Sequence, residues 1–146
     1  MRMWLVDPKL LCNKHLLGEH CEMHAFIGTI KKGISIKGYI KKGLIEPEKI
    51  QERHNELASE MSNRGIHHNS PLFTNISFWY DDKGHVDIEA NLIELSNRCE
   101  KCRKKIGEIT KNENVLYDHL TILLFSNQGQ KFNIKSNYIT INHHSL

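Results

Sequence analysis

Apolar residues recur at intervals of three and four along three long segments of this 146-residue chain. That spacing matches the turn of an α-helix, so each segment predicts a helix with one face toward a core. The most regular segment predicts a helix that starts after Asp87, with the seam Ile88, Leu92, Leu95, Cys99, Cys102, Ile106 and Ile109. The sequence therefore predicts a mainly α-helical fold of about three principal helices, in a single compact domain over residues 1–146.

The other two predicted helices begin at residue types that favour helix starts. The Asp-Pro pair at 7–8 suits the N-cap and first helical position, and a helix from there can run to about Ile30. Pro47 opens the second, which can run to Arg64, with Gly65 as its C-terminal stop. Between them, residues 33–46 are rich in glycine and lysine, and we predict a basic loop there.

The chain after Asn112 no longer follows the helical spacing. Apolar runs at 120–125 and 138–141 lie on either side of a turn-like segment at 127–130. We predict a less regular C-terminal extension over residues 113–146, which leaves room for a short hairpin.

Charge and hydropathy narrow the classes of partner and location. The formal net charge of +3 permits a nucleic-acid partner without requiring one. No apolar run approaches the roughly 18 residues that span a bilayer, and the start of the sequence lacks the apolar stretch of a signal peptide. We therefore expect no membrane partner, and a cytoplasmic location in a bacterial or virus-infected host cell.

One face of the first predicted helix groups a histidine with two carboxylates. At about 100° per residue, His15, Glu19 and Glu22 fall near one another beside the apolar stripe. In a cleft, partial burial would raise the pKa of such carboxylates and suit acid–base chemistry. The alternative is a solvated polar helix face, and spacing alone does not decide between the two.

The cysteines and histidines raise the question of a metal. The C-x-x-C pair at 99–102, completed by Cys21 and His24, would give a zinc site. However, both cysteines of the pair occupy positions otherwise filled by Ile or Leu, which favours a role as small buried apolar residues. We therefore predict no metal ligand, and we interpret the adjacent histidines at 67–68 and 143–144 as structurally neutral.

Basic residues gather in two clusters. One cluster is Lys31, Lys32, Lys37, Lys41 and Lys42, and the other is Arg98, Lys101, Arg103, Lys104 and Lys105. Clusters of this kind are usually solvated surfaces, but they also suit a phosphate backbone.

Three blocks of sequence carry a resemblance to a known family. They are Met1-Arg2-Met3-Trp4, HLLGEHCEMHAF and IQERHNELASEMSNRGIHHNSPL, which together fall within residues 1–72. In combination they resemble the phage-type pyrimidine-dimer DNA glycosylases with AP-lyase activity that are often called endonuclease V. The resemblance implies a small, mostly helical fold whose N-terminus threads between helices into the active site. Residues 113–146 diverge from that family.

The resemblance also implies a mechanism. The free α-amine of Met1 would attack the anomeric carbon of the damaged nucleotide, displace the base, and nick the strand by β-elimination from a Schiff base. Glu22 would stabilise the cationic intermediate and assist proton transfer. An α-amine has a reference pKa of about 7.7–8.0, so it is neutral at physiological pH more readily than a lysine. This chemistry needs no metal and no other cofactor.

For DNA binding, the resemblance implies that Arg2 and His15 bind phosphate and hold the sugar. The best-known member of the family has arginines where this sequence has Cys21 and Ala25, so His24 and His20 are candidate replacements. The complete predicted DNA-binding set is Arg2, His15, His24, Lys31, Lys32, Arg53 and Arg64. The expected partner is double-stranded DNA that contains damaged pyrimidines, with no obligatory protein partner.

Three other hypotheses stay open on the sequence alone. An enzyme of the same fold would act on another lesion, or on abasic sites only. A non-catalytic DNA-binding module would hold zinc between Cys99, Cys102 and histidines. A helical interaction protein would show no salt-dependent affinity for DNA.

Overall fold

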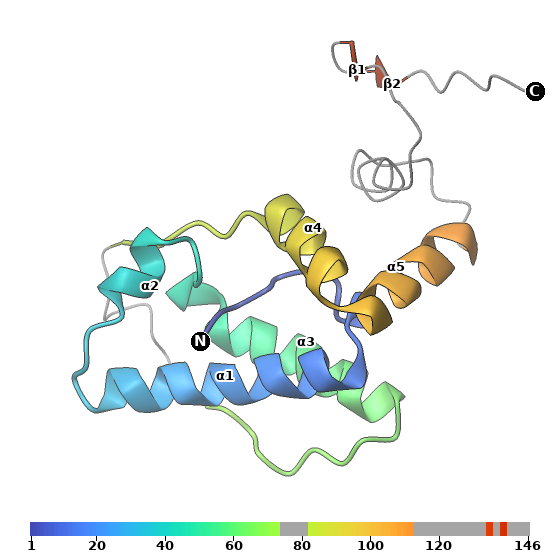
Figure 1. Ribbon diagram of the computed structural model, residues 1–146. Coiled ribbons are helices and arrows are strands. Elements are labelled where there is room, and N and C mark those ends of the chain that lie inside the picture. The colour runs from blue at the N-terminus through green and yellow to red at the C-terminus, as the bar shows by residue number, and fades with distance from the viewer. Residues whose placement is uncertain (74–81, 113–133, 136–137, 140–146) are drawn as a thin grey trace, which may run out of the picture. The chain divides into compact units, whose positions relative to one another are not determined.

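The structure, a computed structural model, describes residues 1–73, 82–112, 134–135 and 138–139. These residues form five α-helices, two short 3-10 helices and one pair of very short strands, which confirms the mainly α-helical fold class (Figure 1). The chain divides into two compact units, Met1–Asn91 and Leu92–Leu146, and each is described by itself. The expectation of a single domain over residues 1–146 stays a prediction.

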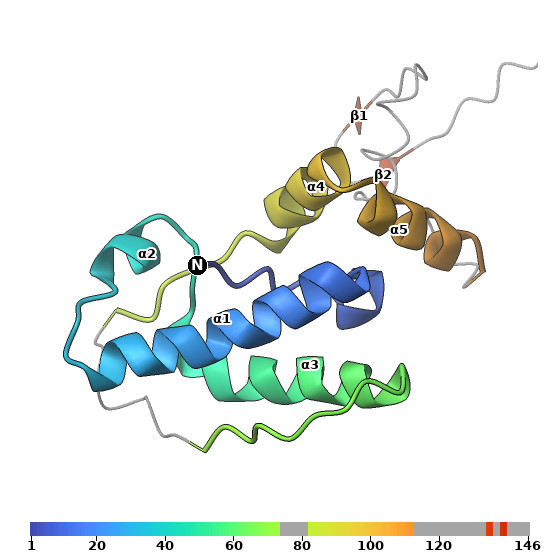
Figure 2. The ribbon, with the colours of Figure 1, turned by 60° about the horizontal axis from the view of Figure 1, so that its bottom comes forward.

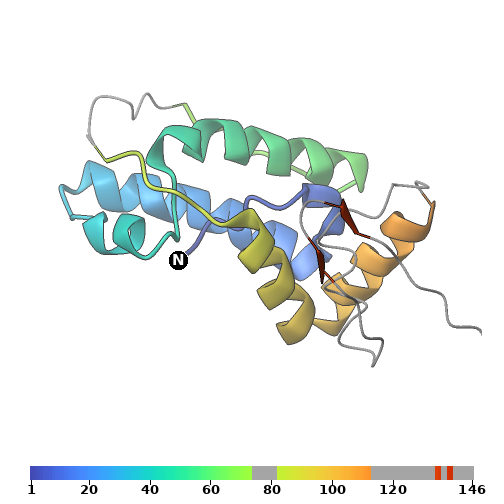
Figure 3. The same cartoon turned by 90° about the horizontal axis from the view of Figure 1, so that it is seen from above.

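The first unit is built around two antiparallel helices, α1 (Asn13–Lys31) and α3 (Ile50–Asn63), which lie side by side in every ribbon view (Figures 1, 2 and 3). The residues that the helical spacing places on the core face are buried, namely Leu16, His20, Met23, Ile27 and Ile30 of α1 and Ile50, Leu57 and Met61 of α3. Burying an apolar side chain of this size contributes about 1.5–3 kcal/mol. The predicted core faces of both helices are confirmed.

The first predicted helix is broken near its start. Asp7 is the N-cap, as predicted, but the helix that follows it is the 3-10 helix η1 (Pro8–Leu10). Arg64, just after α3, donates to the carbonyl oxygens of Pro8 and Leu11 at 3.0 and 2.8 Å. In a continuous α-helix each of those carbonyls would accept from the backbone N–H four residues on. Here the carbonyl of Leu11 accepts from Arg64, and that of Pro8 accepts both from Arg64 and from the backbone N–H of Leu11.

The second predicted helix begins and ends where the sequence indicates. The 3-10 helix η2 (Pro47–Lys49) leads directly into α3. Gly65 follows α3 with a φ of 70°, which glycine adopts at the end of a helix without strain. The predicted basic loop before it contains a short helix, α2 (Lys37–Lys41), with Ile40 buried. Five residues are too few for helical spacing to show in the sequence.

Residues 82–87 pack against the chain just before α3. Gly84 has a φ of 66°, and a Cβ atom there would lie 2.4 Å from the carbonyl oxygen of Ile45. Val86 is buried, and its backbone N–H donates a 2.9 Å hydrogen bond to Glu46 Oε1. A glycine and a buried carboxylate therefore fix the path of the chain into the next helix.

The third predicted helix is two helices, α4 (Ile88–Arg98) and α5 (Glu100–Asn112). Asp87 caps α4, as predicted, by accepting a 2.9 Å hydrogen bond from a backbone N–H of the first turn. Cys99 separates the two helices, and its Sγ accepts a 3.5 Å hydrogen bond from the backbone N–H of Cys102, as the N-cap of α5 would. Apolar spacing continues through Cys99, so it does not reveal this break.

The apolar seam of the two helices is confirmed in part, since Leu92, Leu95, Cys102 and Ile106 are buried. Cys99 and Ile109 are half-buried, and Ile88 is exposed. Farther along, β1 (Ile134–Lys135) and β2 (Tyr138–Ile139) form an antiparallel pair, in agreement with a short hairpin. The other predictions for residues 113–146 lie outside the described residues. Of the helices that the structure describes, none combines the length and the apolar character that a membrane crossing requires.

Candidate active site

The first six residues form an irregular segment that lies against α1 and is part of the core. The backbone N–H of Met3 donates a 2.7 Å hydrogen bond to the carbonyl of Leu44. The side chains of Met3, Trp4 and Val6 are buried. Asn91 Nδ2 donates a 2.9 Å hydrogen bond to the carbonyl of Trp4. These contacts fix the N-terminus beside the middle of α1 (Figures 1 and 2).

Two carboxylates of α1 hold the backbone of this segment. Glu19 Oε1 accepts hydrogen bonds from the backbone N–H groups of Trp4, at 2.7 Å, and Leu5, at 3.3 Å. Glu22 Oε2 accepts a 2.7 Å hydrogen bond from the backbone N–H of Arg2. Leu5 has a left-handed φ of 56°, which costs an L-residue roughly 1–2 kcal/mol. The helix face that groups Glu19 and Glu22 is therefore turned toward the N-terminal segment and is not a solvated face.

The position of Arg2 also places the α-amine of Met1. Three covalent bonds separate that amine from the backbone nitrogen of Arg2, so the two atoms lie within about 4 Å of each other. Met1 is exposed, and Glu22 is half-buried. A primary amine near a half-buried carboxylate supplies a nucleophile and a proton acceptor in one small region.

The side chain of Arg2 adds a fixed positive charge to this region. Its Nη2 donates a 2.7 Å hydrogen bond to Asn91 Oδ1, and its Cζ lies 4.0 Å from the centroid of the Trp4 ring. A guanidinium stacked on an indole is favourable, and its planar donors suit a phosphate. Asn91, in the first turn of α4, is a site residue that the sequence analysis missed. In the sequence, Asn91 is recognisable only as a polar residue next to the apolar seam of the third predicted helix.

His15 lies in the first turn of α1, close to the same indole ring. Its ring meets that of Trp4 edge-on, with the centroids 6.1 Å apart, and its Nδ1 lies 3.3 Å from Cys12 Sγ. Trp4 thus contacts both Arg2 and His15, the two residues that are predicted to bind phosphate and sugar.

The prediction that Arg53 binds DNA needs correction. Arg53 is only 2% exposed, and its Nε and Nη2 bind the two oxygens of Glu19 at 2.9 and 2.8 Å. Its Nη1 binds Glu56 at 2.9 Å. Burial lowers the pKa of Arg53, but the hydrogen bond to Glu19 and the charge of Glu19 raise it further than burial lowers it. A guanidinium enclosed in this way does not reach a phosphate. Instead, Arg53 anchors the carboxylate that holds the N-terminal segment.

The remaining predicted DNA-binding residues lie at other places in the first unit. Arg64 is half-buried and binds backbone carbonyls near the start of α1. Lys31 and Lys32 are exposed at the C-terminal end of α1. The other lysines of their cluster, Lys37, Lys41 and Lys42, are exposed in α2 and directly after it. This lysine cluster is solvated, which suits contact with a phosphate backbone.

His24 lies in a cluster of four histidines from three segments of the chain, which we call the histidine cluster (His20, His24, His54 and His68). Burial, followed by the charges of His54, His24 and His68, lowers the pKa of His20 from 6.5 to about 4. Burial also lowers the pKa of His24. The interpretation of His68 as structurally neutral is wrong, because its ring contacts those of His20 and His54.

Comparison with known protein families gives one match. The family model described as pyrimidine dimer DNA glycosylase matches residues 1–74, in agreement with the resemblance over residues 1–72. That range includes the N-terminal segment together with α1, α2 and α3, and hence both Met1 and Glu22. Neither the curated proteins nor the solved structures give a match to this chain.

Proposed function

Because the chain belongs to the pyrimidine dimer DNA glycosylase family, we propose that it excises damaged pyrimidines with the α-amine of Met1 as nucleophile and Glu22 as the assisting carboxylate. The observation that carries this proposal is the 2.7 Å hydrogen bond from the backbone nitrogen of Arg2 to Glu22 Oε2. It brings the first residue and the carboxylate into one region of a segment that the core holds in place.

The proposed reaction has two stages, removal of the damaged base and cleavage of the strand. The lone pair of the neutral amine forms a bond to C1′ of the damaged nucleotide, and the glycosidic bond breaks with its electron pair going to the base, which takes up a proton. The amine then loses a proton, and the C1′–O4′ bond of the sugar breaks with its electron pair going to O4′, which takes up that proton. The nitrogen lone pair forms the C1′=N bond of an iminium ion, the protonated Schiff base. Loss of a proton from C2′ breaks the C3′–oxygen bond, and the 3′ phosphate departs from a nicked strand.

In this proposal Glu22 serves both stages. As a carboxylate it accepts the proton that the attacking amine loses, and its negative charge stabilises the cationic intermediate next to it. The hydrogen bond from Arg2 occupies only one of its oxygens. Its second oxygen would take part in the proton transfers.

Arg2 and His15 would hold the DNA backbone at the lesion. The guanidinium of Arg2 is oriented by Asn91 and by the ring of Trp4, and His15 contacts that same ring. An amine cannot reach C1′ inside an intact stack, so the proposal requires the enzyme to extrude a nucleotide and bend the duplex. The exposed cluster of Lys31 and Lys32 would contribute salt-dependent affinity for the phosphates.

The experiment that tests this function is borohydride trapping with purified protein on three duplexes, which contain a pyrimidine dimer, an abasic site or no damage. We expect a covalent protein–DNA adduct on the first two duplexes and none on the third. An adduct only on the abasic duplex would support the lyase activity and exclude the glycosylase activity on pyrimidine dimers. No adduct on any duplex, from protein that binds damaged DNA, would overturn the Schiff-base mechanism.

The nucleophile is identified with a matched sample whose α-amine is acetylated. If Met1 is the nucleophile, acetylation abolishes the adduct, and mass spectrometry of the digested adduct finds the DNA on the N-terminal peptide. An adduct that survives acetylation would point to a lysine instead and would remove Met1 from the mechanism.

A further inference from the structure

The histidine cluster brings imidazoles together from α1, α3 and the segment that follows α3. His20 lies on α1, His54 on α3 and His68 five residues beyond the end of α3. One ring nitrogen from each of the three lies within 4.8 Å of the others. The ring of His24, one turn along α1 from His20, lies with its centroid 4.9 Å from that of His54. Three separate segments thus converge on one small volume.

The spacing of these nitrogens suits a metal ion. Zinc–nitrogen bonds of about 2.0–2.1 Å in a tetrahedron place neighbouring ligand atoms about 3.3 Å apart. The Nε2 atoms of His20 and His54 lie 3.1 Å apart. Since the nitrogen of His68 is within 4.8 Å of both, a small rotation of its ring completes a three-histidine set.

Some buried ring nitrogens of the histidine cluster have no hydrogen-bond partner among the described residues. The Nε2 atoms of His24 and His68 are buried, and neither has a hydrogen-bond partner in the described part of the chain. Leaving a buried polar atom in that state costs about 1–3 kcal/mol. Two such atoms in one cluster favour a bound ligand there, because buried polar groups in native proteins are normally paired.

The hydrogen bonds of His54 are also incompletely satisfied, because its ring faces more acceptors than it has hydrogens to donate. Its Nδ1 lies 3.1 Å from Asn55 Oδ1, and its Nε2 lies 3.1 Å from the carbonyl oxygen of Ser70. A neutral imidazole has only one N–H to donate. If Nδ1 carries the hydrogen and donates it to Asn55, the lone pair of Nε2 points into the cluster. That is the arrangement of a metal-binding histidine whose second nitrogen is held by a hydrogen bond.

We propose that His20, His54 and His68 bind one divalent transition-metal ion of the imidazole-preferring class, with His24 or a water molecule as the fourth ligand. Nitrogen-only ligand sets of this kind suit zinc, copper, nickel or iron and disfavour magnesium and calcium. The inference does not depend on the proposed reaction at Glu22. The ion would give the ring of His68 a bonding partner, and that of His24 too where His24 is the fourth ligand.

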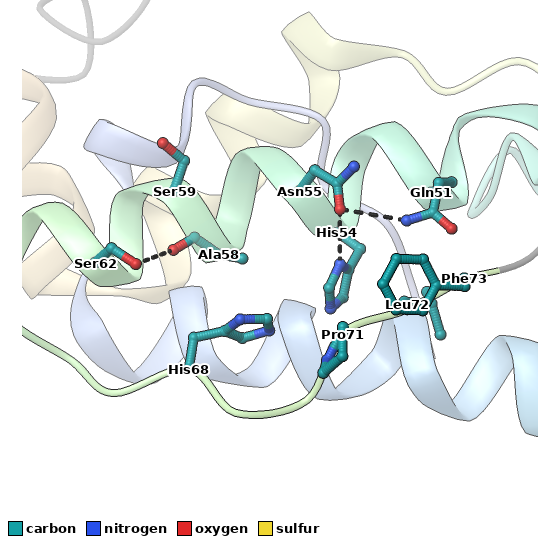
Figure 4. Close-up of a pocket in the computed structure, with 10 residues that line it drawn as sticks. All are labelled: Gln51, His54, Asn55, Ala58, Ser59, Ser62, His68, Pro71, Leu72 and Phe73. Carbon is teal, nitrogen blue, oxygen red and sulfur yellow. Dashed lines mark hydrogen bonds between the residues drawn. The ribbon is translucent and has the colours of Figure 1, made fainter.

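The ion would have a route from solvent. An open groove of about 710 Å³ lies along α3, and His54 and His68 line it together with Pro71, Leu72 and Phe73 (Figure 4). In that view the rings of His54 and His68 project from two different segments into the same space. The ion would therefore join the segment after α3 to the helix pair, and its role would be structural.

The first test is calorimetric titration of the metal-free full chain with zinc. We expect one ion bound per chain and a higher melting temperature with zinc, because a ligand that binds only the folded state stabilises it. His68→Gln should weaken zinc binding at least about 100-fold, because it removes one of three ligands. The half-buried position of His68, outside any helix, makes this the ligand change that the fold tolerates best.

The matched control is His67→Gln, which changes the exposed neighbour of His68. It should leave both zinc affinity and the zinc-dependent rise in melting temperature unchanged. Circular dichroism of both variants without metal confirms that the helices are retained. Equal losses in the two variants, or no zinc binding by the folded wild-type chain, would overturn the site.

A second test separates histidine from cysteine ligation. Cobalt(II) in place of zinc should give the visible bands of a tetrahedral site without the intense near-ultraviolet bands of a thiolate ligand. Those visible bands should be lost in His68→Gln and kept in His67→Gln. Strong thiolate bands that persist in His68→Gln would assign the metal to cysteines and refute the three-histidine site.

Discussion

The backbone nitrogen of Arg2 donates a 2.7 Å hydrogen bond to Glu22 Oε2, so the carboxylate proposed for catalysis also helps to position the first residue. The second carboxylate of the pair, Glu19, holds Trp4 and Leu5 in the same way and is itself anchored by Arg53. Two carboxylates therefore share the positioning of the N-terminal segment. Because Glu19 still holds that segment, a substitution at Glu22 can test the role of its charge.

Replacing Glu22 with glutamine should abolish strand cleavage while DNA binding is retained. Glutamine keeps an oxygen that can accept the hydrogen bond from Arg2, but it loses the charge and the ability to accept a proton. Loss of positioned acid–base catalysis lowers rates about 10²- to 10⁴-fold. Single-turnover cleavage of a dimer-containing duplex measures the rate, and a gel-shift titration measures the affinity.

The matched control for that change is Glu52→Gln, which alters an exposed carboxylate on α3. It should leave the cleavage rate unchanged. Wild-type turnover by the Glu22 variant would exclude this carboxylate from the mechanism, whatever its structural contacts.

Replacing Lys31 and Lys32 together with alanine should weaken DNA binding and flatten its salt dependence. Each phosphate contact contributes about 0.9 to the slope of log affinity against log salt on duplex DNA, so the double change should lower the slope by up to about 1.8. The same lysines changed to arginine keep their charge and should keep the slope. Affinity measured over a range of salt concentrations gives both values, and an unaltered slope in the alanine variant would show that these exposed lysines do not contact phosphate.

Much of the first unit could be predicted from the sequence because its elements follow local rules. Helical spacing identified the buried faces of α1 and α3, and the residue types at Asp7 and Gly65 marked a helix start and a helix end. These features depend only on neighbours within one or two turns. The grouping of Glu19 with Glu22 on one helix face also follows from spacing. Spacing does not reveal that this face packs against the N-terminal segment.

The rest could not be predicted, because it depends on contacts between distant segments. The burial of Arg53 requires Glu19, which is 34 residues away, and an isolated arginine on a polar helix gives no sign of it. Asn91 meets Arg2 across 89 residues. The histidine cluster draws on three segments, so no spacing rule within one helix reveals it.

Replacing Arg53 with methionine should strongly destabilise the protein. The change leaves Glu19 buried without its bidentate partner, and breaking a buried ion pair from one side costs about 3–5 kcal/mol. Urea unfolding of the two proteins measures the difference in the free energy of unfolding. Arg98→Met is the control, since Arg98 pairs with Glu94 at 3.1 Å on an exposed surface, where such pairs contribute at most about 1 kcal/mol. Comparable losses in the two variants would contradict the anchoring role of Arg53.

Replacing Glu46 with glutamine should remove a contribution to stability that depends on pH. Burial raises the pKa of Glu46, but hydrogen bonds from Lys49 and from the backbone N–H of Val86 outweigh burial, and the net pKa is lowered from 4.5. The folded state thus binds this proton less readily than the unfolded state. The stabilisation is complete above pH 4.5 and is lost as the pH falls through the lowered pKa.

Urea unfolding of the wild type and the glutamine variant over a series of pH values tests this sign. The wild type should be more stable at neutral pH by about 1–2 kcal/mol, because a charge-assisted hydrogen bond becomes a neutral one. The difference should shrink in acid, as the Glu46 carboxylate becomes protonated. Glu48→Gln, at an exposed carboxylate 3.6 Å from Lys83, should show little difference at any pH. A difference at Glu46 that stays constant from neutral pH into acid would mean that its charge does not stabilise the path of the chain into α4.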